Sequence, residues 1–265
     1  MMQFLLASFS AILLLAAPLL AQRPEARGHF TQGVGLFYEH DDSGDALMAA
    51  QAEFAAALRL EPRYAAARAY QGLIDLEMNH ESDAEATFRE ALSWDPKCAE
   101  ALVGQARLNQ KSHPPREWLL LLRKAVAVAP RNPLARRDLA YALTAEAINP
   151  SPEMWKEAIE CWRVLIAMDR NDRESHYDLA RALRRFGRWS EAEPHFREVL
   201  RIGQTKEDSD VWVYTVHGEL AAVLANQGKN AEAIREYRAL IASDGAGDEE
   251  IRRARGAIEA LQRRR

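Results

Sequence analysis

A chain of 265 residues is long enough for one large domain or two ordinary ones, and 48% hydrophobic with 28% charged residues is the composition of a folded protein. This composition excludes disorder over the whole length. The formal net charge of −4, with acidic and basic residues interspersed, gives no general basis for binding nucleic acid or an anionic membrane. We therefore expect no nucleic-acid partner.

The beginning of the chain differs from the rest. Residues 4–21 are apolar apart from two serines, and polar residues return abruptly at Gln22. This change is typical of a secretory signal peptide, so we predict that residues 1–21 are one and that cleavage follows Ala21. Because the apolar run is close to the minimum length of a membrane span, an uncleaved anchor at residues 4–21 is the alternative. The expected location is periplasmic or secreted, with membrane contact only if this segment is retained.

The next part of the chain repeats itself with a period of 34 residues. Pro62, Pro96 and Pro130 stand 34 residues apart, and similar sequences precede them. Self-similarity with a period of roughly 20 to 50 residues indicates a repeat array, in which each unit buries its apolar face by stacking on its neighbours. After a linker at residues 22–30, we predict an array over residues 31–247, with units near 31–64, 65–98, 99–132, 133–172, 173–213 and 214–247.

Several positions recur together within these units. The second unit has Gly72, Ala84, Phe88, Ala91 and Pro96 at positions 8, 20, 24, 27 and 32. The pattern resembles the tetratricopeptide repeat (TPR), whose two antiparallel helices need small residues at positions 8 and 20 for close approach. The resemblance covers about residues 31–262. It implies an all-α fold, a right-handed superhelical solenoid of about six helix–turn–helix repeats.

Some units depart from the pattern. Gly33 and Gly35 fall in the predicted opening helix of the first unit, where each weakens a helix by about 1 kcal/mol relative to alanine. In the third unit, Trp118 stands where a small residue belongs. The fourth unit has six extra residues between its helices, and Ser151 followed by Pro152 predicts that the second helix restarts there, as an N-cap and a first-turn proline.

Residues 248–265 predict a last helix after a glycine-containing break. Its first three residues are acidic and its last three are arginines, an order that suits the helix dipole. One face carries an apolar stripe of Ile251, Ala254, Ile258 and Leu261. Since a solenoid needs terminal caps with a polar outer face, we predict a capping helix.

The sequence offers little for chemistry. It has no metalloprotease, Cys-x-x-Cys, nucleophile-elbow or P-loop motif. His176 and His217 both occupy position 4 of successive units, and we expect them to pack at a helix seam, because two histidines do not complete a zinc site. Cys98 and Cys161 lie two units apart, so we predict free thiols rather than a disulfide. The tryptophans are interpreted mainly as core, and we expect no enzymatic activity, metal or cofactor.

The resemblance also implies a binding groove. In tetratricopeptide arrays the first helix of each unit lines the concave face, mainly through positions 2, 5, 9 and 12. Arginine forks bind carboxylates in a bidentate manner, and tyrosines add rigid contact area. The alternative is a solvated face whose arginines pair with local acids such as Glu100 and Glu174. Near the groove positions of units three to five we select as candidates Arg107, Arg137, Tyr141, Tyr177, Arg181 and Arg184.

Repeats and cap occupy the chain after its leader and leave no room for a catalytic domain. The sequence therefore predicts a non-enzymatic interaction scaffold or adaptor, exported to a bacterial-type cell envelope. Its expected partner is a protein or peptide, an acidic one being suited to the arginines, bound in the concave groove. The alternatives are a recruiting subunit of an envelope enzyme or assembly complex, and a self-assembling envelope scaffold.

Overall fold

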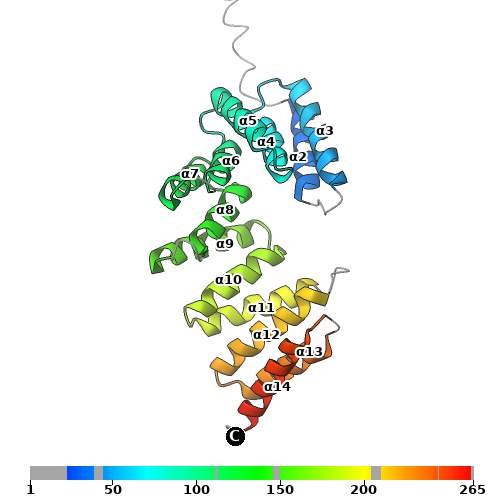
Figure 1. Ribbon diagram of the computed structural model, residues 1–265, viewed down its shortest axis with the longest axis vertical. Coiled ribbons are helices and arrows are strands. Elements are labelled where there is room, and N and C mark those ends of the chain that lie inside the picture. Colours follow the sequence, from blue (N-terminus) through cyan, green and yellow to red (C-terminus); the bar gives the residue numbers. More distant parts are fainter. Residues whose placement is uncertain are drawn as a thin grey trace, which may run out of the picture. The chain divides into compact units, whose positions relative to one another are not determined.

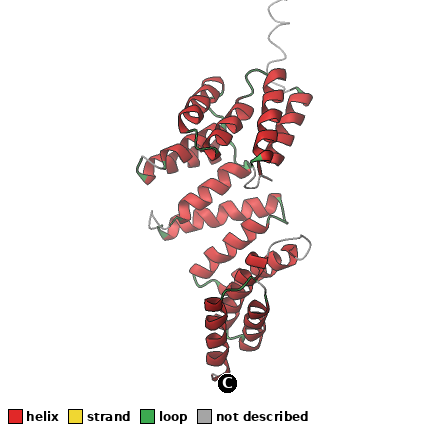
Figure 2. Ribbon diagram, turned by 45° about the vertical axis from the view of Figure 1, so that its right-hand side comes forward, coloured by secondary structure: helices red, strands yellow, loops and turns green. Residues whose placement is uncertain are grey.

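The computed structural model describes residues 23–38, 44–110, 113–145, 150–203, 210–243 and 245–263, and side chains of residues 210–212 are not described. The predicted signal peptide or anchor lies outside the described residues. Every regular element in the described part is an α-helix, as Figure 2 shows, and no strand occurs there. The predicted all-α class, a solenoid of helical repeats, is confirmed. The chain divides into two compact units, Met1–Ala135 and Arg136–Arg265.

The first compact unit contains three successive helix pairs, drawn from blue to green in Figure 1. In each pair the two helices pack on one another, and the first helices of the second and third pairs also lie against each other. This is the arrangement expected when each repeat buries its apolar face on its neighbour. The pairs are α2 (Pro24–Tyr38) with α3 (Asp45–Leu60), α4 (Ala65–Glu77) with α5 (Glu81–Trp94), and α6 (Ala99–Asn109) with α7 (Pro115–Val128).

The linker predicted at residues 22–30 is corrected by the start of α2. This helix begins at Pro24, a residue favoured at the first helical position because its missing N–H would have no intrahelical partner there. Ala26 is completely buried, and the ring of Phe30 lies 4.9 Å from that of Tyr64 and 5.6 Å from that of Tyr70. Burial of these side chains explains why the segment is helical.

The opening helix of the first unit packs closely at Gly33. A Cβ on Gly33 would lie 2.8 Å from the ring of Phe54. Gly72 faces Phe88 in the same way in the next unit, at 2.7 Å. Gly33 therefore permits close helix packing, in addition to its cost in helix propensity.

The second compact unit continues the series of packed helices, from green to red in Figure 1. Consecutive helices from α9 onward pack on one another. Within the described residues, no helix of the chain combines the length and the apolar character that crossing a membrane requires. The helices are α8 (Pro133–Thr144), which begins just before the boundary, α9 (Pro152–Met168), α10 (Arg173–Arg185), α11 (Trp189–Gly203), α12 (Asp210–Asn226), α13 (Asn230–Ala242) and α14 (Asp248–Arg263).

The turns inside three of the repeats close with a residue in the left-handed conformation. Asn79, Gly187 and Gly228 have φ angles of 62°, 66° and 75°, and all three stand at position 15 of their predicted units. Glycine and asparagine are the residues that adopt this conformation at least cost.

The predicted restart of the second helix in the fourth unit is confirmed. The Ser151 side chain accepts a hydrogen bond from the N–H of Met154 at the start of α9.

Two further predictions concern the cysteines and the last helix. Cys98 and Cys161 are both free and buried, as predicted. Residues Asp248–Arg263 form a helix that packs on α13, with Ala254 and Leu261 buried and Ile251 and Ile258 partly exposed. The apolar stripe read from the sequence thus lies on the packed side of α14.

Candidate functional site

Of the predicted groove residues, Arg107 belongs to the first compact unit. It lies on α6, and its guanidinium is 3.3 Å from the carboxylate of Glu77 on α4. The acid that the sequence suggested as a local partner, Glu100, accepts a hydrogen bond from Asn132 (2.6 Å). Arg107 therefore links two successive first helices through Glu77.

Arg137 is largely committed to the junction between α8 and α10. Its guanidinium donates to Asp172 at 3.0 Å and lies 3.8 Å from Glu174, the local acid expected from the sequence. Asp172 is itself the N-cap of α10 and accepts from the N–H of Ser175 at 3.0 Å. The Arg137 side chain is 23% exposed. Arg137 therefore forms an ion pair with the residue that caps α10.

Arg184 makes a similar ion pair one repeat further along. Its Nε lies 2.8 Å from a carboxylate oxygen of Glu219 on α12. Three of the four predicted arginines thus pair with an acid on, or capping, a neighbouring first helix. This agrees with the alternative in which the arginines of this face are paired locally, and it leaves Arg181 as the least engaged of the four.

The two predicted tyrosines lie beside Arg181. The Tyr141 hydroxyl is hydrogen-bonded to Asp178, and burial, followed by the charge of Asp178, raises the pKa of Tyr141 well above its usual range. Tyr177 is buried, and the guanidinium of Arg181 lies 5.5 Å from the centroid of its ring. Arg181 reaches Asp178 only at 4.0 Å and is 55% exposed. Its charge therefore stays available at the surface.

These residues border a hollow of about 410 Å³ between α8, α9, α10 and the start of α11, which we name the tryptophan pocket. It contains three of the predicted residues, Tyr141, Arg181 and Arg184, while Tyr177 lies beneath Arg181. Each contributing helix supplies side chains of different chemistry. The lining consists of Tyr141, Thr144, Trp155, Trp162, Asp178, Arg181, Ala182, Arg184, Arg185 and Trp189.

The sequence pattern did not indicate Arg185, and it did not indicate that three tryptophans interpreted as core also border a hollow. The guanidinium of Arg185 lies 5.0 Å from the ring centroid of Trp155, a cation–π arrangement. The indole nitrogen of Trp162 is buried and has no hydrogen-bond partner. The available signal was the spacing of Arg181 and Arg185, which places both on one face of α10.

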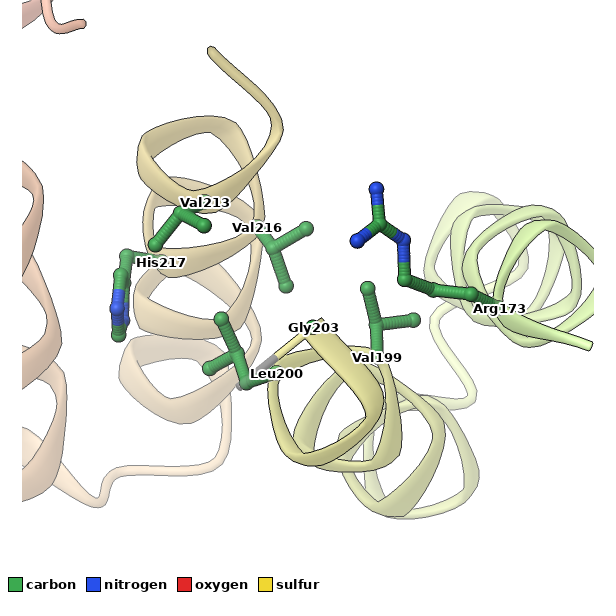
Figure 3. Close-up of a pocket in the computed structure, with 7 residues that line it drawn as sticks. All are labelled: Arg173, Val199, Leu200, Gly203, Val213, Val216 and His217. Atoms are coloured by element: carbon green, nitrogen blue, oxygen red, sulfur yellow. The ribbon is translucent and has the colours of Figure 1, made fainter. Parts of the chain in front are cut away.

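Described residues of the second compact unit form two other hollows. One is a small, mainly apolar cavity of about 140 Å³ between α11 and α12. In Figure 3, Val199 of α11 and Val216 of α12 lie beside the guanidinium of Arg173. A wider groove of about 620 Å³ runs between α12, α13 and α14, with Gly218, Ala254 and Ala257 among small residues and Tyr214 and Tyr237 among larger ones. The first hollow is too small for a peptide, and the second has a mixed, charge-balanced lining.

The histidines at position 4 each contact the second helix of their own repeat. His176 Nδ1 lies 2.9 Å from His195 Nδ1, and His217 Nδ1 lies 2.7 Å from Glu236. The predicted packing at a helix seam is therefore found, although the seam lies within a repeat. Among the described residues, no group of three or more His, Cys, Asp or Glu is arranged to hold a metal ion.

A family model described as the tetratricopeptide repeat matches residues 155–207, which run from α9 through α11. The tetratricopeptide repeat family is thereby supported. The matched segment includes Trp155, Trp162 and Trp189, and with them most of the tryptophan pocket. A comparison with curated proteins finds no match.

Solved structures of TPR proteins share this fold. YrrB, described as a TPR protein with an unusual peptide-binding site, aligns with a TM-score of 0.57 at 18% identity, over 79% of this chain and 97% of YrrB. PilW, a type IV pilus biogenesis factor, aligns with a TM-score of 0.55 at 16% identity, over 91% of this chain and 99% of PilW. PilF of Pseudomonas aeruginosa aligns with a TM-score of 0.55 at 20% identity, over 76% of this chain and 90% of PilF. At these identities the likeness concerns the fold.

Proposed function

We propose that the protein is a non-enzymatic scaffold or adaptor that binds a peptide or protein segment of a partner. The observation that carries this proposal is the tryptophan pocket, where arginine and aromatic side chains from successive helices converge. Tryptophan, tyrosine and arginine are the residues that most often dominate the energy of protein interfaces. The fold likeness to YrrB, described by its peptide-binding site, supports the same kind of function.

We also propose that the protein is exported and acts in a bacterial-type cell envelope or outside the cell. The change from apolar residues 4–21 to polar sequence at Gln22 supports export. The fold likeness to PilW, a type IV pilus biogenesis factor, is in keeping with a role in the envelope. N-terminal sequencing of the protein from cell fractions tests this. A chain that begins at Gln22 supports cleavage, and Met1 retained in the membrane fraction supports the anchor.

The partner is identified by affinity purification of the protein from its own envelope extract, and its affinity is then measured with purified components. Arg181→Glu reverses an exposed charge of the pocket. We expect it to weaken binding by about tenfold or more, which corresponds to about 1.4 kcal/mol. Arg137 is less suitable for this test, because a glutamate there would face Asp172 and Glu174 and disturb the start of α10.

Arg252→Glu on the exposed side of α14 is the matched control, since Arg252 lies outside the pocket lining and its side chain donates to the backbone oxygen of Asp248. It should bind the partner as the unchanged protein does. Equal affinity of the Arg181→Glu variant would show that the partner binds elsewhere. Reproducible turnover of a substrate by the purified chain would contradict the non-enzymatic assignment.

A further inference from the structure

The walls of the tryptophan pocket are aromatic on three sides. Trp155 and Trp162 come from α9, Trp189 from the start of α11, and Tyr141 from α8. Aromatic rings pair edge to face, as Trp155 already does with Phe186 at 5.6 Å between centroids and 79° between planes. An aromatic side chain of a ligand would therefore find matching partners here, chiefly the more exposed rings of Tyr141 and Trp189, since Trp155 and Trp162 are 9% and 3% exposed.

The α10 side of the pocket is basic. Arg181 and Arg185 are four residues apart and so lie on one face of the helix. Among the described residues, Arg185 has a ring contact with Trp155 and no acidic partner, and Arg181 is only loosely paired with Asp178, at 4.0 Å. Both guanidinium groups are thus available to a ligand carboxylate, which arginine binds with two parallel hydrogen bonds.

The acidic groups nearby do not cancel this charge. Asp178 is the acidic residue of the described lining, and it is hydrogen-bonded to the Tyr141 hydroxyl. Glu219 neutralises Arg184 from outside the lining, at 2.8 Å. Three arginines therefore face two carboxylates, so a positive charge remains.

The size of the pocket fits more than one side chain. In an extended peptide, which rises about 3.3 Å per residue, side chains two positions apart point to the same side and are separated by about 6.6 Å. Arg181 and Arg185 are four residues apart, which is about 6 Å along α10 and close to this separation. The pocket of about 410 Å³ has room for two alternate side chains of one peptide, one beside the aromatic rings and one beside the arginines.

Building on the scaffold function proposed above, we propose that the tryptophan pocket binds an extended protein segment carrying an aromatic residue and an acidic residue two positions apart. The aromatic side chain packs beside the rings of Tyr141 and Trp189. The acidic side chain pairs with Arg181 and Arg185. The pocket therefore selects for both residue types and for their spacing.

Short unlabelled peptides with both ends blocked test this directly, using calorimetry or the tryptophan fluorescence of the purified chain. The reference peptide has the central sequence Phe-Ser-Glu between glycine and serine residues. We expect saturable binding, and a loss of about fivefold or more for Phe-Ser-Gln, for Ala-Ser-Glu and for the adjacent arrangement Phe-Glu-Ser. Equal affinity for all four peptides, or no binding of the reference up to millimolar concentration, overturns the proposal.

A fifth peptide distinguishes an acidic side chain from a free C-terminus as the source of the bound carboxylate. It ends in Phe with a free C-terminus and contains no acidic side chain. If it binds more tightly than the blocked reference peptide, the pocket takes a chain terminus and the proposed internal segment is wrong. If it binds more weakly, the carboxylate comes from the acidic side chain, as proposed.

Protein variants locate the binding. Arg181→Gln combined with Arg185→Gln should lower the affinity for the reference peptide by about tenfold, the loss expected for a charge-assisted contact. The control combines Arg235→Gln with Arg238→Gln, two exposed arginines of α13 outside the pocket lining, and should leave binding unchanged. Equal losses in both double variants would reveal non-specific charge attraction and overturn the assignment to the pocket.

The native partner distinguishes this inference from the wider function. If the partner still binds the Arg181→Gln, Arg185→Gln variant at full affinity, the scaffold function stands and the pocket assignment fails. If no protein binds the unchanged chain, the scaffold function fails as well. If the partner binds the unchanged chain and binds the pocket variant more weakly, both the scaffold function and the pocket assignment are supported.

Discussion

Phe88 on α5 lies so close to Gly104 on α6 that a Cβ added to this glycine would stand 2.2 Å from the aromatic ring. Gly72 on α4 approaches the same ring, with 2.7 Å for its added Cβ. Phe88 is completely buried, so its ring has little room to retreat. The phenylalanine at position 24 thus inserts between the first helix of its own repeat and that of the next.

Gly104→Ala should therefore destabilise the protein even though alanine favours a helix. The helix propensity gained is about 1 kcal/mol, whereas overpacking a tight core costs typically about 1–3 kcal/mol. Because the added Cβ would lie well below van der Waals distance from the Phe88 ring, we expect the packing cost to dominate. Urea denaturation should show a lower midpoint with an unchanged slope.

Gly35→Ala in α2 is the matched control, because nothing lies within 4 Å of an added Cβ at this position. It should raise the free energy of unfolding by about 0.4–1 kcal/mol, the usual gain when a helical glycine is replaced without strain. If both alanine variants shift stability in the same direction, the tight packing of Phe88 against Gly104 is not the controlling factor.

The sequence predicted the repeats best where the connection between the two helices has its usual length. In the first unit the link between α2 and α3 is longer than the link between α4 and α5, so Gly33 stands 21 residues before Phe54, whereas Gly72 stands 16 residues before Phe88. A fixed period carries no information about such an insertion. The aromatic contacts of Phe30 reveal it only when the structure is known.

The candidate site was predictable in part for a similar reason. Arg181 and Tyr141 follow from groove positions of the repeat, and both line the tryptophan pocket. Trp155 and Trp162 are 9% and 3% exposed, which confirms their interpretation as core, and both also border the hollow. Apolar residues at helical spacing look the same in the sequence whether they pack against another helix or border a hollow. The pairing of Arg137 with Asp172 depends on the geometry of a helix start, which the sequence pattern does not resolve.

The contact between His176 and His195 should make stability dependent on pH. Burial, together with the charges of His176 and Arg163, lowers the pKa of His195 to about 4, while Glu191 and Glu198 act in the opposite direction. The unfolded chain, with an ordinary histidine pKa of about 6.5, binds this proton more readily. The contribution is therefore intact above about pH 6.5 and is lost as the pH falls towards about 4.

Urea denaturation at pH 7.5 and pH 4.5 measures this effect. His195→Gln removes the titrating group, so we expect the variant to lose less stability on acidification than the unchanged protein. His80→Gln, at an exposed position before α5, controls for general loss of a histidine and should leave the pH dependence as it was. Parallel pH profiles for all three proteins would contradict the role of the histidine pair.

Asp172 should contribute to stability in two separable ways. It caps α10 through the N–H of Ser175, and it accepts a hydrogen bond from Arg137. Asp172→Ala loses both and should cost about 1–2 kcal/mol, as for other N-cap residues. Asp172→Asn retains a capping side chain and should cost less. Thermal or urea denaturation compares the two, and equal losses would mean that the cap contributes little beyond the charge.

Helix α14 should stabilise the end of the array by covering α13. Leu261 is 5% exposed in this position, and replacing a buried leucine by alanine costs about 2–5 kcal/mol. Leu261→Ala should therefore lower the free energy of unfolding within this range, or towards its lower limit if the end of the helix relaxes. The neighbouring Gln262→Ala changes an exposed side chain and should have almost no effect.

Removal of Asp248–Arg265 is the stronger form of the same test. It uncovers the side of α13 that carries Tyr237 and Leu240, two residues that border the groove beside α14. Exposed apolar surface at the end of a repeat array favours association, because the terminal repeat has no neighbour to bury it. We expect a lower melting temperature together with concentration-dependent light scattering. A truncated chain that melts like the full chain and stays monomeric would show that α14 is not a cap, and the effect of Leu261→Ala would then be confined to the stability of α14 itself.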